Sequence, residues 1–488
     1  MPELVTYAVL VLGPDVHRVV AATEPGGSGD PFEGLTARQR AALATLYRSG
    51  FQLGGEFQLA QPGPEFAIMR ILLGLASEQD PQYFRDFWQQ PGYIGADGLL
   101  DEELVDKTCT ATRVVRLGEL DLEQRLRLNS LLLRLDVTGP AWNDATPIGV
   151  VTSAAPDRPL GCELTLRSGP AAGQRLTCIG SIDDVLVADF PNGDDLDRIS
   201  PGDTIHLDNR RFLAYCHMHL HQVDPDGPGA GQFQAAGHPI YPQLERSLQD
   251  VLVGVRAQAR FDGKLIYVGS VHDSMTNTLG WPVTYADQVR AHLGAAAADR
   301  LRVWLNDNAT HIQGSERPVG STPAATTRLV DWIGSVEQAV DDLVAWVETG
   351  RTPPSDTAFR HTDGQLQLPR HAADRGGLQP VVTASANGAT ALQTAAGAPV
   401  SLAVHAEVPP GAGYLIRVEW DFDGSGTWPC QHPDVDGTAS RFDGSVEHVF
   451  RVPGTYFPAV RVTAHRTGDT SAERGLIPNV GRVRVDVS

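Results

Sequence analysis

Two periodicities of apolar residues divide the chain into stretches of different predicted structure. Apolar residues recur at helical spacing in Leu35–Tyr47 and, mixed with other periods, in Leu120–Leu133, so residues 1–147 are predicted to be mainly helical. In residues 148–223, short β-rich runs such as Glu163–Arg167 alternate with Gly, Pro and Asp turns. This second stretch is predicted to form a small β-barrel-like insertion.

Strand and helix patterns then alternate through residues 224–352. Lys264–Ser270 and Leu301–Leu305 have the pattern of buried strands, Trp281–Leu293 that of an amphipathic helix, and Arg328–Glu348 that of a long helix. Such alternation predicts a parallel sheet. The periodicity of the long helix predicts one inward apolar face, made of Leu329, Trp332, Ile333, Val336, Val340, Leu343, Val344 and Trp346 or Val347.

The last part of the chain changes character again. Residues 353–380 are polar and punctuated by Pro and Gly, which predicts a linker. Residues 381–488 are rich in Val, Thr and Ala, and Leu415–Phe422 and Tyr456–Thr463 alternate at strand period. A β-sandwich of the size of an immunoglobulin-like domain is predicted there.

Composition and charge exclude several classes of partner. The 488 residues hold 39 Lys and Arg against 59 Asp and Glu, a formal charge of −20. Cationic side chains supply most of the affinity for nucleic acid and for anionic membranes, so neither partner is expected. The longest apolar runs, Tyr7–Leu12 and Ala67–Leu75, are far shorter than a membrane helix, so no membrane span is predicted.

The five cysteines do not define a disulfide framework by their number. Cys162 and Cys178 flank a Gly/Pro-rich turn, and a hairpin centred near residue 170 would place them opposite each other. Either a disulfide or two buried free thiols fits this arrangement.

Two residues with catalytic chemistry follow the two predicted parallel strands. Asp273 lies just beyond Ser270, and His311 lies a short loop beyond Leu305. Ligands of open α/β sheets bind outside the carboxyl ends of the strands. An acid followed by a histidine matches the last two members of a Ser…Asp…His triad, in which the carboxylate orients the imidazole and the imidazole takes the proton of the nucleophile. The alternative is a helix-capping Asp and a solvated His.

Several segments resemble the tannase and feruloyl esterase group, in the same order along the chain. Gly263–Asp273, followed by Tyr285, is similar to the strand and loop that carry the acid of that group. The other segments resemble its lid entrance, lid and closing helix; they are Asp30-Pro31 with Leu35–Leu43, Phe87–Asp97 and Trp346–Pro354.

The resemblance implies ester hydrolysis through an acyl-enzyme, with Asp273 as the triad acid and His311 as the base. It also implies that residues 1–147 hold a helical lid and a hydrolase remnant. The group has a cysteine beside this histidine, whereas Ile312 follows His311 here, so the corresponding disulfide is not expected. The insertion at 148–223 is not a standard lid.

The sequence contains no Gly-x-Ser-x-Gly nucleophile elbow. Three explanations stay open: the polypeptide is the C-terminal part of a longer hydrolase, it is a non-catalytic relative, or a partner chain supplies the nucleophile. We expect the first. The expected fold class is thus α/β, with the C-terminal half of an α/β-hydrolase sheet, a helical lid, a small β-barrel-like insertion and a C-terminal immunoglobulin-like β-sandwich.

Two further motifs carry possible ligands. Cys216–His221 contains three alternate histidines, His217, His219 and His221, which would share one face of a strand and could bind Zn²⁺ or Cu²⁺ with Asp224; packing in a pocket wall or interface is the alternative. Glu419–Gly426 and Pro453–Tyr456 resemble the polycystic-kidney-disease (PKD) type of β-sandwich repeat.

The same PKD-like motif contains oxygen donors at alternate positions. Asp421, Asp423 and Ser425 have the spacing of the first half of a Ca²⁺ loop, although His432 stands where such a loop ends in Glu. A weak calcium site is one interpretation, and Asp side chains that cap backbone amides are the other.

The expected function is that of the C-terminal portion of a secreted serine esterase. Its substrates would be aryl or acyl esters, either small molecules or linked to a polymer, and no cofactor is required apart from possible calcium in the C-terminal domain. The protein is expected to be extracellular, because PKD-like repeats occur in surface and secreted proteins, with the signal peptide upstream of Met1. The alternative is a non-catalytic scaffold for adhesion or carbohydrate binding through the PKD-like domain.

Overall fold

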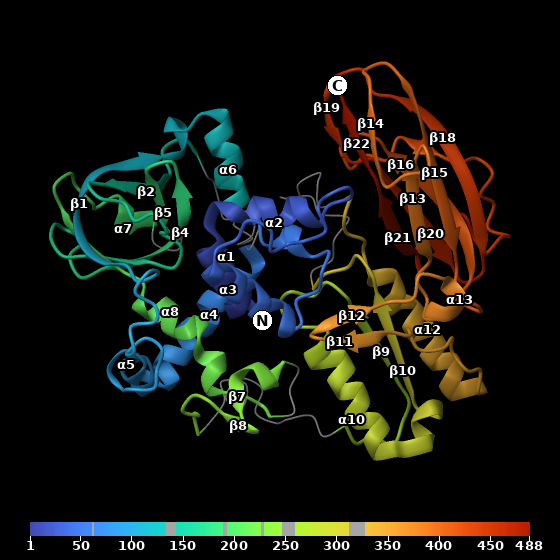
Figure 1. Cartoon of the computed structure of the whole chain (residues 1–488), viewed down its shortest axis with the longest axis horizontal. Coiled ribbons are helices and arrows are strands. Elements are labelled where there is room, and N and C mark those ends of the chain that lie inside the picture. Colours follow the sequence, from blue (N-terminus) through green and yellow to red (C-terminus); the bar gives the residue numbers. More distant parts are fainter. Residues whose placement is uncertain (61–62, 133–142, 189–192, 226–228, 246–258, 312–326) are drawn as a thin grey trace.

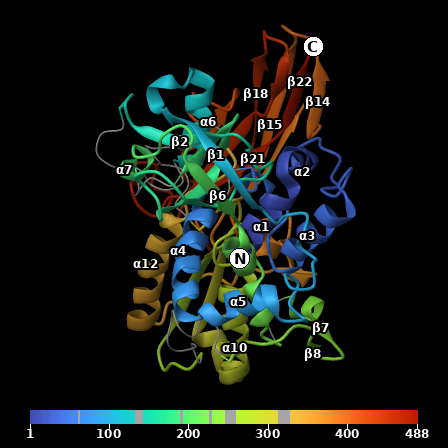
Figure 2. The same cartoon turned by 90° about the vertical axis from the view of Figure 1, so that its left-hand side faces the viewer.

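The computed structural model describes residues 1–60, 63–132, 143–188, 193–225, 229–245, 259–311 and 327–488. The chain is mixed α/β. In Figure 1 the N-terminal helices lie at the centre, a β-barrel lies to one side, and the α/β part and the C-terminal β unit lie to the other. Figure 2 shows the molecule turned by 90°, with the barrel side toward the viewer and the C-terminal β unit behind it.

The N-terminal part is helical, as its periodicity predicts. Thr36 caps one helix through a capping box with Gln39, at the position where the sequence changes to strong helix formers. Leu43, Leu46 and Tyr47 of that helix are buried in the core. The helices of this part are α1 (Pro2–Leu12), α2 (Val16–Thr23), α3 (Ala37–Arg48), α4 (Gly63–Gln79) and α5 (Pro81–Gln89).

The first helices form a longer apolar segment than the sequence analysis expected. Pro2–Thr23 forms a helical run of 22 residues that is long and apolar enough, by length and composition only, to cross a membrane. Half of its most apolar window is buried inside the protein, and a tighter turn at Gly13–Asp15 interrupts it. The described part of the chain therefore holds no clear membrane span. The sequence has no uninterrupted apolar run over this segment, because Pro14, Asp15 and Arg18 divide it.

The predicted barrel is present and closed, with six strands in the order β1-β2-β5-β4-β3-β6. Its first strand comes from the part expected to be helical, so the β-rich unit begins at Asp106 and not at residue 148. Aliphatic side chains, together with Cys162 and Cys178, fill its interior. The strands are β1 (Asp106–Arg116), β2 (Pro147–Thr152), β3 (Glu163–Leu166), β4 (Arg175–Ile182), β5 (Val185–Ala188) and β6 (Thr204–Asp208), with α6 (Leu122–Leu132) and α7 (Gly193–Leu196) between them and α8 (Arg210–Cys216) after them.

Two parallel strands form the centre of the α/β part, as predicted. β9 (Leu265–Ser270) pairs in register with β10 (Leu301–Asn306). One face packs on α10 (Thr284–Leu293) through Ala286 and Val289. The other face packs toward α12 (Ile333–Thr349), so the sheet is covered on both faces (Figure 1).

The helix α12 does not bury the face that its apolar period predicts. Val340, Val344 and Val347 are 54%, 49% and 62% exposed. Of the expected face only Trp346 is fully buried. The other buried positions are small or polar, because α12 packs against backbone and ion pairs: they are Gly334, Ser335, Gln338, Ala339 and Asp342.

The predicted linker is structured and docked. Residues 355–357 bind the outer edge of β10, where the Thr357 amide donates to the Val303 carbonyl (2.8 Å). A hairpin of β11 (Arg360–Thr362) and β12 (Gln365–Gln367) follows, and α13 (Ala372–Arg375) comes after it. The side chain of Gln365 donates to the carbonyls of Tyr47 and Phe51, which fixes the hairpin to the N-terminal helices.

The C-terminal unit is all β. It has three sheets, in the orders β13-β15-β18, β14-β22-β19 and β17-β16-β20-β21, around one apolar core that contains the fully buried Trp420. Pro458 divides the expected strand Tyr456–Thr463 in two. The strands are β13 (Val381–Ala386), β14 (Ala391–Thr394), β15 (Pro399–Glu407), β16 (Tyr414–Asp421), β17 (Cys430–Gln431), β18 (Arg441–Val449), β19 (Gly454–Tyr456), β20 (Ala459–His465), β21 (Ile477–Arg482) and β22 (Arg484–Val487).

Candidate active site

The structure brings Asp273 and His311 into contact. Both residues lie beyond the carboxyl ends of the parallel strands β9 and β10, where the sheet register holds the two loops side by side. Nδ1 of His311 lies 3.0 Å from Oδ2 of Asp273. A carboxylate only accepts hydrogen bonds, so this contact places a proton on Nδ1 and makes Nε2 the basic nitrogen of the neutral ring.

The Asp273 carboxylate is held by four donors. Its Oδ1 accepts the amides of Met275 (2.9 Å) and Thr276 (2.8 Å), and its Oδ2 accepts the Thr276 hydroxyl (2.6 Å) as well as His311. Burial acts to raise the pKa of Asp273, but the hydrogen bonds from His311 and Thr276 outweigh it and the pKa is lowered. The group is therefore an anion at neutral pH.

The two partners differ in access to solvent. The Asp273 side chain is 13% exposed, whereas that of His311 is 41% exposed. A buried anion that orients an accessible imidazole is the arrangement needed for general-base catalysis. The pair can therefore accept a proton from a nucleophile and stabilise the imidazolium that forms.

Distant segments fix the loop that carries Asp273. Gln58 bridges to it twice: its Nε2 donates to the His272 carbonyl (3.1 Å) and its Oε1 accepts the Ser274 hydroxyl (2.8 Å). The His272 amide in turn donates to the carbonyl of Ala309, on the loop of His311 (3.0 Å). These bonds position the acid and the base relative to each other.

A second His–Asp pair lies on the same two loops, and the sequence analysis did not predict it. Nε2 of His272 is 3.7 Å from Oδ1 of Asp307, which also faces Arg375 at 3.4 Å. Burial acts to raise the pKa of Asp307, yet the nearby His272 and Arg375 lower it. Both residues follow strand ends, as Asp273 and His311 do, and that position was the available signal.

Among the residues that the structure describes, one edge of the small sheet has no partner strand. Within the described residues β9 pairs only with β10, and all six of its residues are half-buried. Parallel strands in α/β proteins are normally buried and paired on both sides. The edge of β9 is thus the place at which a further strand of this sheet would add.

The three alternate histidines do not lie on a strand. They follow α8 in a short helical turn, Met218–His221. His221 stacks on Tyr93, with ring centroids 4.6 Å apart, and His217 contacts Tyr7 at 4.4 Å. Burial lowers the pKa of all three imidazoles. These contacts fit the alternative interpretation, in which the three histidines pack inside the protein. The predicted zinc or copper site receives no support from the geometry of the described residues.

Another three residues have ligand atoms close enough together to hold a metal ion. Ligand atoms of Asp106, His206 and Asp208 lie within 4.8 Å of one another. The guanidinium of Arg210 already bridges the two carboxylates, with Nη2 2.5 Å from Asp106 and Nη1 3.1 Å from Asp208. The hydrogen bond of Arg210 is the main cause of the lowered pKa of Asp106. A cation fits poorly where a fixed guanidinium already neutralises both acids.

The candidate calcium residues form a turn. Oδ1 of Asp421 accepts the amides of Asp423 (3.2 Å), Gly424 (2.8 Å) and Ser425 (3.2 Å), and Oδ2 accepts that of Gly426. The carboxylate of Asp421 is fully buried in doing so. The capping interpretation accounts for these contacts, and calcium binding by Asp421, Asp423 and Ser425 stays a prediction.

The predicted hairpin places Cys162 and Cys178 opposite each other, since the next pair along β3 and β4 is Glu163 with Thr177. Both are free thiols in the structure and both are buried. Burial raises the pKa of both thiols, that of Cys178 to about 12. The structure therefore agrees with the interpretation as two buried free thiols and not with a disulfide.

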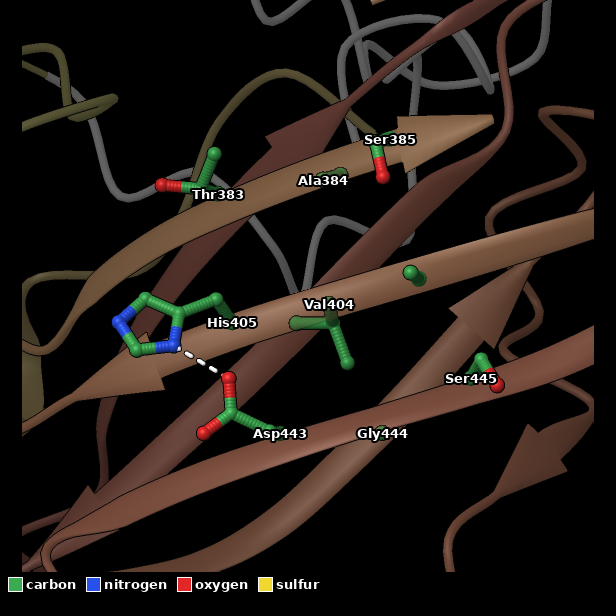
Figure 3. Close-up of a pocket in the computed structure, with 9 residues that line it drawn as sticks. Thr383, Ala384, Ser385, Val404, His405, Asp443, Gly444 and Ser445 are labelled. Carbon is green, nitrogen blue, oxygen red and sulfur yellow. Dashed lines mark hydrogen bonds and ion pairs between the residues drawn. The ribbon is translucent and has the colours of Figure 1, made fainter. Parts of the chain in front are cut away.

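The C-terminal unit has a hollow of its own. It measures about 440 Å³ and lies over β13, β15 and β18 (Figure 3). Small residues such as Thr383, Ser385 and Ser445 line it, and at one end Nδ1 of His405 lies 2.6 Å from Oδ1 of Asp443. The nine lining residues include no Phe, Tyr or Trp.

Comparisons with known proteins leave the family open. No family model and no curated protein matches the chain. Among solved structures, the CARDB domain of a Pyrococcus furiosus protein, crystallised with two metal ions, is 18% identical over 22% of this chain and 94% of that domain, with a TM-score of 0.17. At that score the likeness carries no argument about fold or function.

Proposed function

We propose that this chain carries the acid and base of a carboxylic ester hydrolase. The observation that supports the proposal is the 3.0 Å contact between the buried Asp273 and the accessible His311 at the carboxyl ends of β9 and β10. The same order and position are those of the last two triad members in α/β-hydrolases.

The reaction follows from the tautomer that Asp273 imposes. Nε2 of His311 takes the proton of an attacking serine hydroxyl, the serine oxygen bonds to the ester carbonyl, and the ring then protonates the departing alcohol. In the second half, His311 takes a proton from water, which attacks the acyl carbonyl, and the ring returns the proton to the serine oxygen as the bond to the acyl group breaks and the acid is released. Asp273 stays ionised throughout and stabilises the imidazolium, as its lowered pKa favours.

The nucleophile is assigned to a segment outside the 488 residues, because the sequence has no nucleophile elbow. Within the described ranges the outer edge of β9 has no partner strand, and this supports the assignment. In α/β-hydrolases the serine lies on a strand-to-helix turn of the same sheet, so a strand added beside β9 would bring a serine to the end of the sheet where His311 lies.

The substrate class and the location rest on the resemblances. The similarity of Gly263–Asp273 to the tannase and feruloyl esterase group favours aryl or acyl esters, free or linked to a polymer. The PKD-like motif at Glu419–Gly426 favours an immunoglobulin-like C-terminal domain and a secreted protein.

Turnover of chromogenic acyl esters tests the proposal. We expect the full product of the gene to hydrolyse them and His311→Ala to lower kcat at least about 1,000-fold. The matched control is His292→Ala on α10, a histidine away from the two loops, which should leave turnover unchanged. Unchanged activity in His311→Ala, or no turnover of any acyl ester, would refute the proposal that the protein is an ester hydrolase.

The second candidate is a scaffold that binds a polymer through its C-terminal unit. The hollow over β13, β15 and β18 is the feature that favours it. Pull-down by insoluble polysaccharides separates the two: binding that is lost with residues 381–488, in a protein without esterase activity, would support the scaffold.

A further inference from the structure

The loop that carries His311 is in contact with the C-terminal part of the chain. The α/β part and the C-terminal β unit lie next to each other (Figure 1). The loop begins after Asn306, the last residue of β10, and reaches His311 five residues later. Residues 307–309 of this loop each contact the C-terminal part, so the position of the base depends on these contacts.

Gln379, at the end of the docked linker, binds the backbone of Asp307 on both sides. Its Oε1 accepts the Asp307 amide (2.7 Å), and its Nε2 donates to the carbonyls of Asp307 (3.0 Å) and Pro478 (3.0 Å). The Gln379 side chain is buried, and a buried amide is costly unless it is hydrogen-bonded. The loop therefore supplies hydrogen bonds that this side chain needs.

Asn308 joins the loop to β21. Its Nδ2 donates to Oδ1 of Asn479 (2.9 Å) and to the Val480 carbonyl (3.2 Å). Asn479 is buried as well, and its own Nδ2 donates to the Pro380 carbonyl (2.7 Å). A buried asparagine of β21 thus connects the loop to the start of the C-terminal unit.

Ala309 links the C-terminal unit to the loop of the acid. Its side chain is fully buried in an apolar cluster with Ala459 of β20 and Val480 of β21. Its carbonyl accepts the amide of His272, which directly precedes Asp273 (3.0 Å). A displacement of Ala309 would therefore move the base and the acid relative to each other.

We propose that the C-terminal β unit is part of the active site, in which Gln379 and Asn479 are positioning residues that hold His311 against Asp273. A module that is joined only by a flexible linker makes few contacts with its neighbour. Here the contacts are buried and end two residues before the base. The effect on catalysis rests on the proposed function, whereas the holding of the loop does not.

Asn308→Gly in the 488-residue chain tests the holding of the loop without any turnover. Asn308 has a φ of +52°, which glycine adopts without strain, so the substitution removes only the side-chain bonds to β21. We expect hydrogen exchange of the His272 amide, measured by NMR, to become at least about tenfold faster, because its acceptor at Ala309 is held less firmly. The matched control is Asn387→Gly, an asparagine with a φ of +48° whose side chain accepts the Ser401 amide in a turn of the C-terminal unit. Exchange at His272 should be unchanged in this control.

Gln379→Met in the full gene product tests the effect on catalysis. The thioether keeps the length of the side chain but cannot replace its hydrogen bonds to Asp307. We expect kcat for chromogenic acyl esters to fall at least about tenfold while KM changes less than about twofold, because the base is displaced and the contacts to the ester stay. Asn387→Gly should leave both constants unchanged.

The two measurements separate the possible failures. Unchanged exchange at His272 in Asn308→Gly, or exchange that becomes faster to the same extent along β13 and β20, would overturn the holding of the loop. An unchanged kcat in Gln379→Met, or a change in KM alone, would overturn the positioning role in an active esterase. A full gene product without esterase activity would refute the proposed function instead, and exchange at His272 would still decide whether the C-terminal unit holds the loop.

Discussion

Replacement of Asp273 by Asn isolates the contribution of one carboxylate to the candidate site. The substitution keeps the size of the side chain but removes the charge and one acceptor oxygen. Of the four donors on Asp273, two are the backbone amides of Met275 and Thr276. Hydrogen bonds to a charged group contribute about 1.5–3 kcal/mol each, and the side chain is buried enough for that value to apply.

Hydrogen exchange of these two amides measures the effect locally. A loss of about 1.5–3 kcal/mol corresponds to a protection factor lower by about 10- to 100-fold at Met275 and Thr276. Asp287→Asn is the matched control, because this aspartate forms an exposed ion pair with Arg290 and does not touch the loop. In this control variant the protection factors of the Met275 and Thr276 amides should stay the same within error.

The effect also has a predicted pH dependence. The pKa of Asp273 is lowered in the folded chain, so its stabilisation is present above the ordinary carboxyl pKa and is lost as the pH falls through the folded value. Wild type and Asp273→Asn should therefore differ at pH 7 and converge at strongly acidic pH. Equal protection at pH 7, or a difference that persists unchanged in acid, would refute the reasoning.

Two further predictions concern the barrel and the packing of α12. Cys162 and Cys178 should resist iodoacetamide at pH 8 while the half-buried Cys430 reacts, because burial keeps the barrel thiols protonated. Mass spectrometry of the labelled peptides measures the extent of modification at each cysteine. Equal labelling of the three cysteines would contradict the prediction. Gly334→Ala should destabilise the contact between α12 and the C-terminal unit by about 1–3 kcal/mol, since its Cβ would lie 1.8 Å from the Leu476 carbonyl; an unchanged thermal unfolding midpoint would contradict this close packing.

The sequence predicted the site best where strand ends could be located. Lys264–Ser270 and Leu301–Leu305 are short apolar runs with clear ends, so the loops that follow them, and hence Asp273 and His311, could be placed at one edge. The contact itself depends on bonds from Gln58, which is more than 200 residues away in sequence, and no local pattern indicates it.

The sequence failed where tertiary packing overrides periodicity. Strand β1 has polar side chains on its exposed face and was included in a helical part, although its barrel neighbours β2 and β6 decide its structure. In α12 the contact is made by Gly334 and Asp342, so the apolar period predicted Trp346 correctly but placed the exposed Val340 and Val344 inside. The ion pairs of Glu24 with Arg328 and Arg482 join three segments that lie far apart in the chain.

Labelling by a fluorophosphonate that reacts with activated serines tests the central claim most directly. In the full gene product we predict covalent labelling of a single serine on a strand-to-helix turn, lost in His311→Ala, reduced in Asp273→Asn and retained in His292→Ala. Labelling that persists without His311, or a full-length protein in which no serine is labelled, would contradict the assignment of Asp273 and His311 as a catalytic acid and base.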